Sequence, residues 1–528
     1  MIGHASLKCL VQRINNIAKT MPCKYLQRCL RNLICVGLLC SHPVLAQWDI
    51  STAANVYAVG DVHGAYTELV DLLRGNGLID DQLNWRGGDN VLVSVGDLLD
   101  RGPDSRKVQD LFMRLQQQTQ EAPGTVVVVL GNHEVMNLLR EFRDVSQAEI
   151  AAFGQPADYA HAMSSAGQYG RWMAGLPAMV KVNDSVFVHG GLTPEAAAMD
   201  LNARVKTAIG TIQSYGEQLV AAQLLAPQVS YVDAIDADLD SPAAARAAAG
   251  SLVLGEYGPL WYRGNAGCHP LLERTRVEQA LATLKASRIV VGHTPTPQRE
   301  VVSRFDGQVV LIDTGMLRQT YRGQSRLLRI NGDSLVVLDA AGQAVPIQQE
   351  VSPNREPSKV NPAQASRLKT RQKKAYAAYL LDQWLGLNLV IPFEVGVENT
   401  IFPESVLTEV SRQQRGWRRP SYCGDRSDYD LVSVFDSLIG KLDRSGADLG
   451  YDPRSWQIRL TNHGGAFVTG AGLPEYAQPP KLPATLADRL QQLDETTLAN
   501  VVNGLLKKRQ MRALLKRRDK ILSWPVVE

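Results

Sequence analysis

The chain is poor in two features that mark other classes of protein. Of its seven cysteines, five lie before residue 47, so only Cys268 and Cys423 remain in the rest of the 528 residues. Two cysteines permit one disulfide without requiring it, and they exclude a cysteine-rich zinc site. No apolar run approaches the roughly 20 residues that a helix needs to span a bilayer. These shortages favour an ordinary globular protein with a sizeable core.

An excess of charge of one sign is also missing. The 56 basic residues nearly balance the 53 acidic ones, at a formal charge of +3. The balance is uneven, because residues 1–46 contain six basic residues and no Asp or Glu. Without those six positive charges the formal charge becomes −3. The composition therefore gives no reason to expect a nucleic-acid partner.

Residues 1–46 have the organisation of an export signal. Basic residues precede the apolar stretch Leu33–Cys40, and Val44-Leu45-Ala46 offers a small-residue cleavage pattern. A start at Met21 would give a signal of ordinary length. The alternative is a short amphipathic anchor that stays on the chain. We expect an exported protein, either periplasmic or secreted.

After this segment, short apolar strands recur, and glycine with a polar residue ends each of them. The strands span Asn55–Gly60, Val91–Gly96, Thr125–Gly131, Ser185–Val188, Arg288–Gly292 and Val309–Ile312. Helix-like segments such as Tyr66–Arg74 and Ser105–Gln118 lie between several of them. Strands that alternate with helices predict an α/β layered core with much parallel sheet. Ligands of such sheets gather outside the carboxyl ends of the strands.

Composition also suggests how the chain is divided. We expect a signal peptide over 1–46, a core domain over 47–340, a linker over 341–370 and a mainly helical domain over 371–528. The linker is rich in Pro, Ser, Asn and charge, and it has little apolar content. Helical insertions at 141–176 and 194–262 are expected to cap the site and to carry substrate selectivity. Peripheral packing is the equal alternative for both.

Polar residues at the strand tips form a set of candidate metal ligands. They are Asp61, His63, Asp97, Asn132, His189 and His293. Carboxylate, imidazole and amide groups without thiolate suit Mn²⁺, Fe or Zn²⁺. Six ligands exceed the needs of one catalytic metal, so we expect two divalent ions about 3.5–4 Å apart. Asp97, on the central tip, is the natural bridge, and a hydroxide activated by both ions would be the nucleophile.

Residues beside these ligands have the chemistry of phosphoryl transfer. His133 is left free to act as a general acid, and Asp100 can orient it. Arg101 can hold phosphoryl oxygens in a fork. Asp313 also ends a strand, but we expect it to support a ligand or a turn rather than to bind metal.

Five motifs stand in a fixed order along the chain: Gly60-Asp61-Val62-His63-Gly64, Gly96–Gly102, Gly131–Glu134, His189-Gly190-Gly191 and Gly292-His293. As an ordered set they resemble the motifs of PPP-type metallophosphatases with a calcineurin-like fold. The surroundings, including Gly258–Gly264, are most similar to bacterial-type Shewanella-like protein phosphatases.

The resemblance implies a role for each motif residue. It implies one metal on Asp61 and His63, another on Asn132, His189 and His293, and Asp97 shared by both. It further implies Arg101 and Arg263 as phosphate clamps, with Asn132 as a substrate contact and His133 with Asp100 as the acid pair. We therefore expect a metal-dependent phosphomonoester hydrolase, with phosphoproteins or small phosphoesters as substrates. The alternatives are a dinucleoside polyphosphate hydrolase, or a binding or scaffold protein that acts through its C-terminal domain.

The C-terminal domain loosely resembles lipid-kinase-like or secretory-kinase-like folds over 373–387, 443–448 and 460–467. Asn462 stands where an Asp would hold magnesium, and no glycine-rich phosphate loop is present. We expect either a degenerate kinase-like module or a plain helical accessory domain. The tail Leu505–Leu522 carries eight basic residues and one Asp. It is expected to be a solvated face of a packed helix or to contact an anionic membrane surface.

Overall fold

The computed structural model describes residues 49–226, 229–235, 243–350, 360, 362–391, 428–445, 448–451, 457–476 and 479–527. The described residues belong to one compact unit, which extends over Trp48–Glu528. The expected signal peptide and Cys423 lie outside the described residues. Among the described helices, none combines the length and the apolar character needed to cross a membrane.

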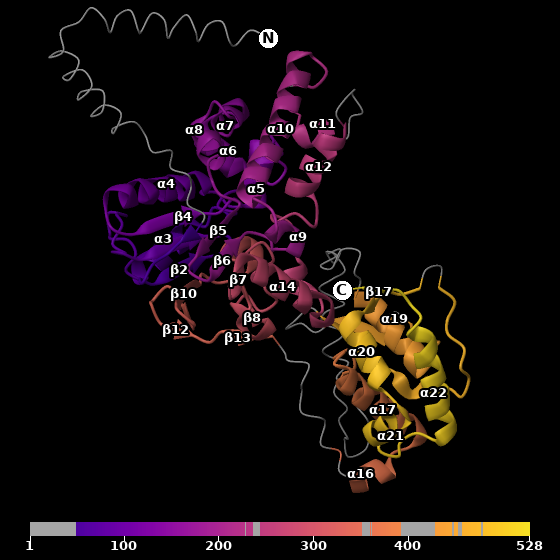
Figure 1. Cartoon of the computed structure of the whole chain (residues 1–528). Coiled ribbons are helices and arrows are strands. Elements are labelled where there is room, and N and C mark those ends of the chain that lie inside the picture. Colours follow the sequence, from indigo (N-terminus) through magenta and orange to yellow (C-terminus); the bar gives the residue numbers. More distant parts are fainter. Residues whose placement is uncertain are drawn as a thin grey trace, which may run out of the picture. The chain divides into compact units, whose positions relative to one another are not determined.

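The first of two large sheets contains the strands that lead into the N-terminal motifs (Figure 1). In spatial order it consists of β12 (Ala344–Val345), β11 (Ser334–Leu338), β10 (Leu327–Asn331), β2 (Val56–Val59), β3 (Val91–Ser94) and β4 (Thr125–Val128). The strands β2, β3 and β4 are parallel, whereas β10 runs antiparallel to β2. Three motif loops therefore leave this sheet at the same edge.

The second sheet contains the strands that lead into the remaining motifs. Its order is β1 (Asp49–Ile50), β5 (Met179–Val182), β6 (Ser185–Val188), β7 (Arg288–Val291), β9 (Val309–Leu311), β8 (Val302–Arg304) and β13 (Gln348–Gln349). The strands β6, β7 and β9 are parallel. All six strands expected from the sequence are thus present.

The two sheets pack face to face, with helices on their outer faces. Val56 and Ala58 of β2 share a buried apolar cluster with Phe187 of β6 and Val290 of β7. Alternate residues of β2 point the other way, and Val59 packs with the helices α3 (Tyr66–Gly75) and α4 (Ser105–Glu121). Because both faces of each strand are covered, the strands are nearly continuous apolar runs. The expected α/β layered fold is confirmed.

The two insertions form helices that lie next to α5 (Asn132–Leu138), which begins at a predicted ligand (Figure 1). They are α6 (Gln147–Phe153), α7 (Pro156–Ala162), α8 (Gln168–Met173), α9 (Pro194–Ala197), α10 (Leu201–Ala221), α11 (Tyr231–Ile235) and α12 (Ala243–Leu254). Short helices α13 (Gly264–Gly267) and α15 (Arg318–Tyr321), the 3-10 turn Phe305–Gly307 and the longer α14 (Pro270–Leu284) complete this part. The helical character expected for both insertions is therefore present.

The C-terminal residues are mainly helical, as expected, and they form most of a buried apolar cluster that Cys268 and Leu272 also join. The helices are α16 (Pro362–Arg367), α17 (Thr370–Leu385), α19 (Asp428–Ile439), α20 (Ala484–Gln492), α21 (Glu495–Val502) and α22 (Lys508–Ile521). The short strand pairs β14 (Leu449–Tyr451) with β15 (Ile458–Leu460), and β16 (Leu482–Pro483) with β17 (Val526–Val527), join them, as does the 3-10 turn His463–Gly465.

Local contacts set the ends of the C-terminal helices and of the core. Residues 484–522 form three helices, because Asp494 caps a new helix and Asn503 adopts a left-handed conformation that ends it. The strands β12 and β13 lie at the start of the expected linker 341–370 and extend the two large sheets. The core therefore continues to residue 349.

Candidate active site

The two sheets bring their motif loops together at one edge. The backbone N–H of His293, after β7, donates to both carboxylate oxygens of Asp61, after β2, at 3.0 Å each. Nδ1 of His189, after β6, donates to the carbonyl of Val95 at 2.8 Å. Residues more than 90 positions apart in the sequence are thus neighbours in the site.

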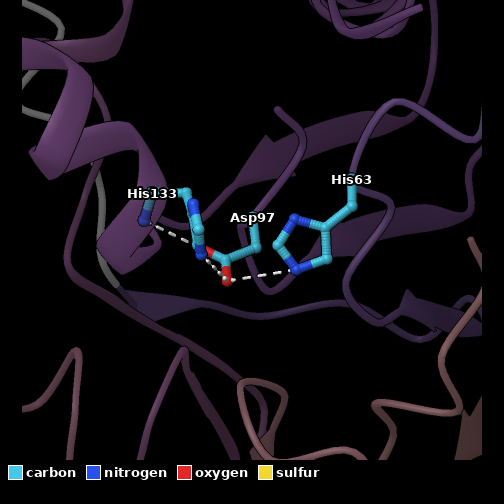
Figure 2. Close-up of side chains that lie close together, drawn as sticks. All are labelled: His63, Asp97 and His133. Atoms are coloured by element: carbon cyan, nitrogen blue, oxygen red, sulfur yellow. Dashed lines mark hydrogen bonds and ion pairs between the residues drawn. The ribbon is translucent and has the colours of Figure 1, made fainter. Parts of the chain in front are cut away.

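Two groups of possible metal ligands share one carboxylate. His63, Asp97 and His133 form one group, and Asp97, His189 and His293 form the other, with the ligand atoms of each group within 4.8 Å of one another. All five side chains are buried. Figure 2 shows Asp97 between His63 and His133. The position of Asp97 in both groups is the one expected of a bridging ligand.

The orientation of the imidazoles leaves their Nε2 atoms available to a cation. The Nδ1 atoms of His63 and His189 donate to backbone carbonyls at 3.0 and 2.8 Å. Their Nε2 atoms therefore face the Asp97 carboxylate, at 3.7 and 3.2 Å. The Nε2 atom of His293 is buried and has no hydrogen-bond partner within the described part of the chain. Such orienting bonds to Nδ1 are typical of metal-ligating histidine.

Asn132 adds an amide oxygen to the second group. Its Oδ1 lies 2.8 Å from Nε2 of His189, which also faces Asp97. Three atoms that accept hydrogen bonds are thus directed at one another. A divalent cation shared by these atoms would satisfy all of them.

The charges of the site also fit bound cations. Burial, together with the nearby carboxylates of Asp313 and Asp97, raises the pKa of Asp61 well above its usual range. Burial lowers the pKa values of His63 and His293 well below the ordinary value, so both rings are neutral. Burial would raise the pKa of Asp97, but the surrounding histidines hold it well below its ordinary value. The residues present therefore fit a dinuclear divalent metal centre.

Two further carboxylates, the predicted ligand Asp61 and the predicted supporting residue Asp313, lie beside the cluster. Asp61 belongs to neither group of three ligands, and its oxygens bind the His293 N–H. Asp313, after β9, is hydrogen-bonded to Asp61 and accepts the N–H of Gly315 at 2.9 Å. The placement of Asp313 next to Asp61 agrees with the supporting role expected from the sequence.

The predicted acid pair is present and faces the cluster. Nδ1 of His133 donates to Oδ2 of Asp100 at 2.6 Å, and Nε2 lies 3.9 Å from Oδ2 of Asp97. Burial alone would lower the pKa of His133, but Asp97 and Asp100 outweigh it and raise the pKa above the ordinary value. A histidine that keeps its proton beside a reacting phosphoester can serve as a general acid.

The two predicted phosphate clamps lie on different sides of the cluster. Arg101 places a guanidinium nitrogen 2.9 Å from Nε2 of His63, and its side chain is 33% exposed. Arg263 donates from one guanidinium nitrogen to the His293 carbonyl and to Oγ1 of Thr294, at 3.0 Å each. Each arginine therefore adjoins one histidine of the site.

The backbone is strained where the motif loops turn. His63, Asp97, Asp100, Arg101 and His293 have φ between 47° and 70°, which side-chain-bearing residues rarely adopt. Each such residue costs on the order of 1–3 kcal/mol. These residues all lie in the motif loops. The strained backbone lowers the folding stability of the protein, and it fixes the positions of the site side chains.

Three residues that were not among the predicted site residues contact the site. The carboxylate of Glu134 accepts the N–H groups of Asp97, Leu98 and Gly131 at 2.8–2.9 Å and fixes the loop that carries Asp97. The hydroxyl of Tyr321 contacts Arg101, and its ring stacks on His63 at 5.6 Å between centroids. Trp261 meets His293 edge to face, at 5.5 Å. Glu134 lies within the motif Gly131–Glu134, so the sequence could have indicated a role for it. Tyr321 lies outside the five motifs, and no pattern in its neighbourhood predicts its position in the site.

A layered α/β fold whose strand tips present a buried Asp/His cluster beside an Asp–His acid pair defines a metal-dependent phosphoester hydrolase. The family model described as calcineurin-like phosphoesterase matches residues 54–297. An uncharacterized protein of Schizosaccharomyces pombe is 31% identical over 311 residues, which cover 55% of this chain and 82% of the relative. The chain belongs to the calcineurin-like phosphoesterase family.

Other relatives carry descriptions of their activity. Shewanella-like protein phosphatase 1 of Plasmodium berghei is 29% identical, over 52% of this chain and 71% of its own. A symmetrical bis(5'-nucleosyl)-tetraphosphatase of Wigglesworthia glossinidia brevipalpis is 36% identical over 16% of this chain and 25% of its own. A solved cold-active protein-tyrosine phosphatase of a psychrophilic Shewanella is 26% identical, covers 57% of this chain and 82% of its own, and has a TM-score of 0.44.

The family model and the two relatives from Schizosaccharomyces pombe and Plasmodium berghei confirm the expected family and its metallophosphoesterase activity. The family match ends at residue 297, so the kinase-like resemblance of the C-terminal domain stays a prediction. The described residues hold a disulfide at Cys268, whose partner lies outside them.

Proposed function

We propose that this metallophosphoesterase is a protein phosphatase, which removes phosphoryl groups from phosphorylated side chains. The observation that carries the proposal is the His133–Asp100 pair, whose Nε2 faces the Asp97 cluster. Such a pair can protonate the oxygen of an alkyl or aryl leaving group, which a phosphorylated side chain releases. Shewanella-like protein phosphatase 1 of Plasmodium berghei, which matches 52% of this chain, supports the same substrate class.

The residues of the site divide the work of hydrolysis. Divalent cations, when bound, neutralise phosphoryl charge and lower the pKa of a water molecule that attacks phosphorus. Arg101 and Arg263 bind and orient the phosphoryl oxygens. As the bond from phosphorus to the leaving oxygen breaks, His133 gives that oxygen its Nε2 proton. Asp100 accepts the Nδ1 proton of His133 in a hydrogen bond and stabilises the positive charge of the imidazole ring before the proton on Nε2 is transferred.

A comparison of two substrate classes tests the proposal. The full-length protein, loaded with Mn²⁺, Fe or Zn²⁺, is assayed on a phosphopeptide panel containing phosphotyrosine, phosphoserine and phosphothreonine, and on a dinucleoside tetraphosphate. We expect higher kcat/KM on at least one phosphopeptide. Higher kcat/KM on the dinucleotide would overturn the proposal in favour of the second candidate, which the shorter matches to bis(5'-nucleosyl)-tetraphosphatases favour.

The metal and the compartment are part of the same proposal. Imidazole, carboxylate and amide donors without thiolate are compatible with manganese. Residues 1–46 have the pattern of a cleaved export signal, which supports an exported protein, either periplasmic or secreted. Metal analysis of the protein isolated from its source, together with its N-terminal sequence, tests both points. An uncleaved N-terminus on a protein found in the cytosol would refute export.

We also propose that the C-terminal helix contacts an anionic membrane surface. On α22 the cations Lys508, Arg512 and Lys516 are exposed, while Leu514 and Ile521 are buried. Cosedimentation with phosphatidylglycerol vesicles, compared with neutral phosphatidylcholine vesicles, tests this. Equal recovery with both vesicles would show that the cations are only a solvated face.

A further inference from the structure

The predicted acid pair is backed by two polar side chains that the motifs do not include. Asn137, one turn after His133 on α5, donates from Nδ2 to Oδ1 of Asp100 at 2.9 Å. Tyr159, on α7, donates from its hydroxyl to Oδ1 of Asn137 at 2.7 Å. Tyr159, Asn137, Asp100 and His133 are all at most 2% exposed. Four buried groups thus form one continuous hydrogen-bonded chain that ends at the site.

The chain of bonds uses each oxygen of Asp100 for a different purpose. Oδ2 accepts from Nδ1 of His133, whereas Oδ1 accepts from Asn137. The carboxylate is therefore held in one orientation, and with it the histidine tautomer whose Nε2 faces the cluster. A buried carboxylate that lost one of these donors would be free to rotate and would be left partly unsatisfied.

Tyr159 determines which way the Asn137 amide points. An amide presents an oxygen at one end and an NH₂ group at the other, and the two ends differ only in hydrogen bonding. Because the Tyr159 hydroxyl donates to the oxygen, the NH₂ group is directed at Asp100. Asn137 also donates to the carbonyl of His133 at 3.1 Å, which ties the amide to the same helix.

We propose that Asn137 and Tyr159 are positioning residues for the acid step of phosphoester hydrolysis. They hold the Asp100–His133 pair in the geometry from which Nε2 delivers its proton to the leaving oxygen. The inference rests on the proposed role of His133 as the acid. It also gives the insertion 141–176 a function, because α7 supplies the Tyr159 hydroxyl, which interacts with Glu149 of α6 as well.

A merely structural role for Tyr159 is the competing explanation. Its ring packs edge to face against Phe142 and Phe153, at 5.3 and 5.2 Å between centroids. Loss of that packing would lower stability and activity for every substrate alike. Loss of acid positioning would instead depend on how much the leaving group needs a proton. The dependence on the leaving group therefore separates the two explanations.

Tyr159→Phe is the first test, since it removes the hydroxyl and keeps the ring. The full-length, metal-loaded variant is assayed on a series that runs from nitrophenyl phosphate to unsubstituted phenyl phosphate. We expect kcat to fall about tenfold on phenyl phosphate and no more than about twofold on nitrophenyl phosphate, with KM unchanged. Tyr169→Phe is the matched control, because the Tyr169 hydroxyl donates to Asp110 at 2.7 Å, outside the acid chain.

Combination with a substitution of the acid makes the test specific. His133→Asn alone should show the same leaving-group dependence more strongly, and Tyr159→Phe should add nothing to it. Asn137→Leu, which removes both polar atoms at similar volume, should behave like Tyr159→Phe. Equal loss on all substrates, an additive double variant, or unchanged kcat in both single variants would overturn the inference. If His133→Asn itself showed no leaving-group dependence, the acid role in the proposed function would fail instead.

Discussion

At the scale of single residues, the site depends on side chains whose charge is set by their surroundings. Burial keeps His63 and His293 neutral, whereas Asp97 and Asp100 outweigh burial at His133 and raise its pKa. Three histidines of one buried site therefore have two kinds of chemistry. The neutral rings fit cation ligation, and the protonated ring fits proton donation.

Arg101, the more exposed of the two predicted phosphate clamps, is expected to contribute directly to substrate binding. Arg101→Ala should lower kcat/KM for a phosphopeptide by roughly 10- to 100-fold, because a charged hydrogen bond to phosphate contributes about 1.5–3 kcal/mol. Arg101→Lys should restore little of this loss, since an ammonium group cannot form the two-pronged contact. The measurement is steady-state kinetics of the metal-loaded protein.

Arg74→Ala provides the control, because Arg74 is an exposed residue of α3 that pairs with Asp81. It should leave kcat/KM unchanged. Wild-type kinetics in Arg101→Ala would show that the guanidinium does not contact the phosphoryl group.

At the scale of helices and strands, the insertion 141–176 is coupled to the acid loop as well as packed beside it. Glu149, near the start of α6, accepts the Ser105 hydroxyl at 2.6 Å and the backbone N–H of Asp100. Burial, followed by the charge of Asp100, raises the pKa of Glu149 to about 8. The first helix of the insertion therefore holds a carboxyl group that is neutral at neutral pH.

This pKa gives a prediction with a defined sign. The group has a higher pKa in the folded chain than in the unfolded chain, so its favourable contribution is present at low pH and is lost as the pH rises toward about 8. Glu149→Gln, which mimics the neutral form, should match the wild type near pH 5. Near pH 8 it should be more stable than the wild type by on the order of 1 kcal/mol or more.

Urea unfolding of both proteins across this pH range is the measurement. A stability difference that does not change with pH would contradict the raised pKa. A larger difference at pH 5 than at pH 8 would reverse its sign.

The elements could be predicted to different degrees. Strands such as β3 are covered on both faces and carry unbroken apolar runs, so they were expected correctly. The strands β1 and β13 have two residues each, which is too short for any periodic pattern. The break before α21 depends on a hydrogen bond from the backbone N–H of Thr497 to the side chain of Asp494. The residues around this position are typical of helices, so the composition does not predict the break. Strands long enough to show an apolar pattern could thus be predicted from the sequence. Two-residue strands and helix ends set by single hydrogen bonds could not.

At the scale of the whole molecule, the site exists because two sheets meet. Glycine and a polar residue end each of the predicted strands. Because parallel strands end at one edge of a sheet, this pattern predicted that the polar side chains of the site would lie close together. Tyr321 contacts Arg101, which lies 220 positions away in the sequence, and no local sequence pattern predicts this contact. Tyr159 reaches Asn137 from an inserted helix in the same way. Ligands on strand ends were therefore predictable, and the side chains that surround them were not.

The convergence of buried carboxyl groups predicts that metal removal destabilises the fold. Asp61, Asp97 and Asp313 repel one another, as the raised pKa values of Asp61 and Asp313 reflect alongside their burial. Bound cations would relieve this repulsion and bind only the folded chain. Chelation should lower Tm by roughly 5 °C or more, and divalent metal should restore it. An identical Tm with and without chelator would contradict a metal site at this position.

The number of metal ions bound to Asp97→Asn and to the wild type tests whether Asp97 is needed for both ions. Asp97 is shared by both groups of ligands. The wild type should bind two divalent ions per chain, and the variant should lose both together with hydrolysis while circular dichroism shows it folded. Two ions retained by an active Asp97→Asn protein, or a wild type that binds none and still hydrolyses phosphoesters, would contradict the account.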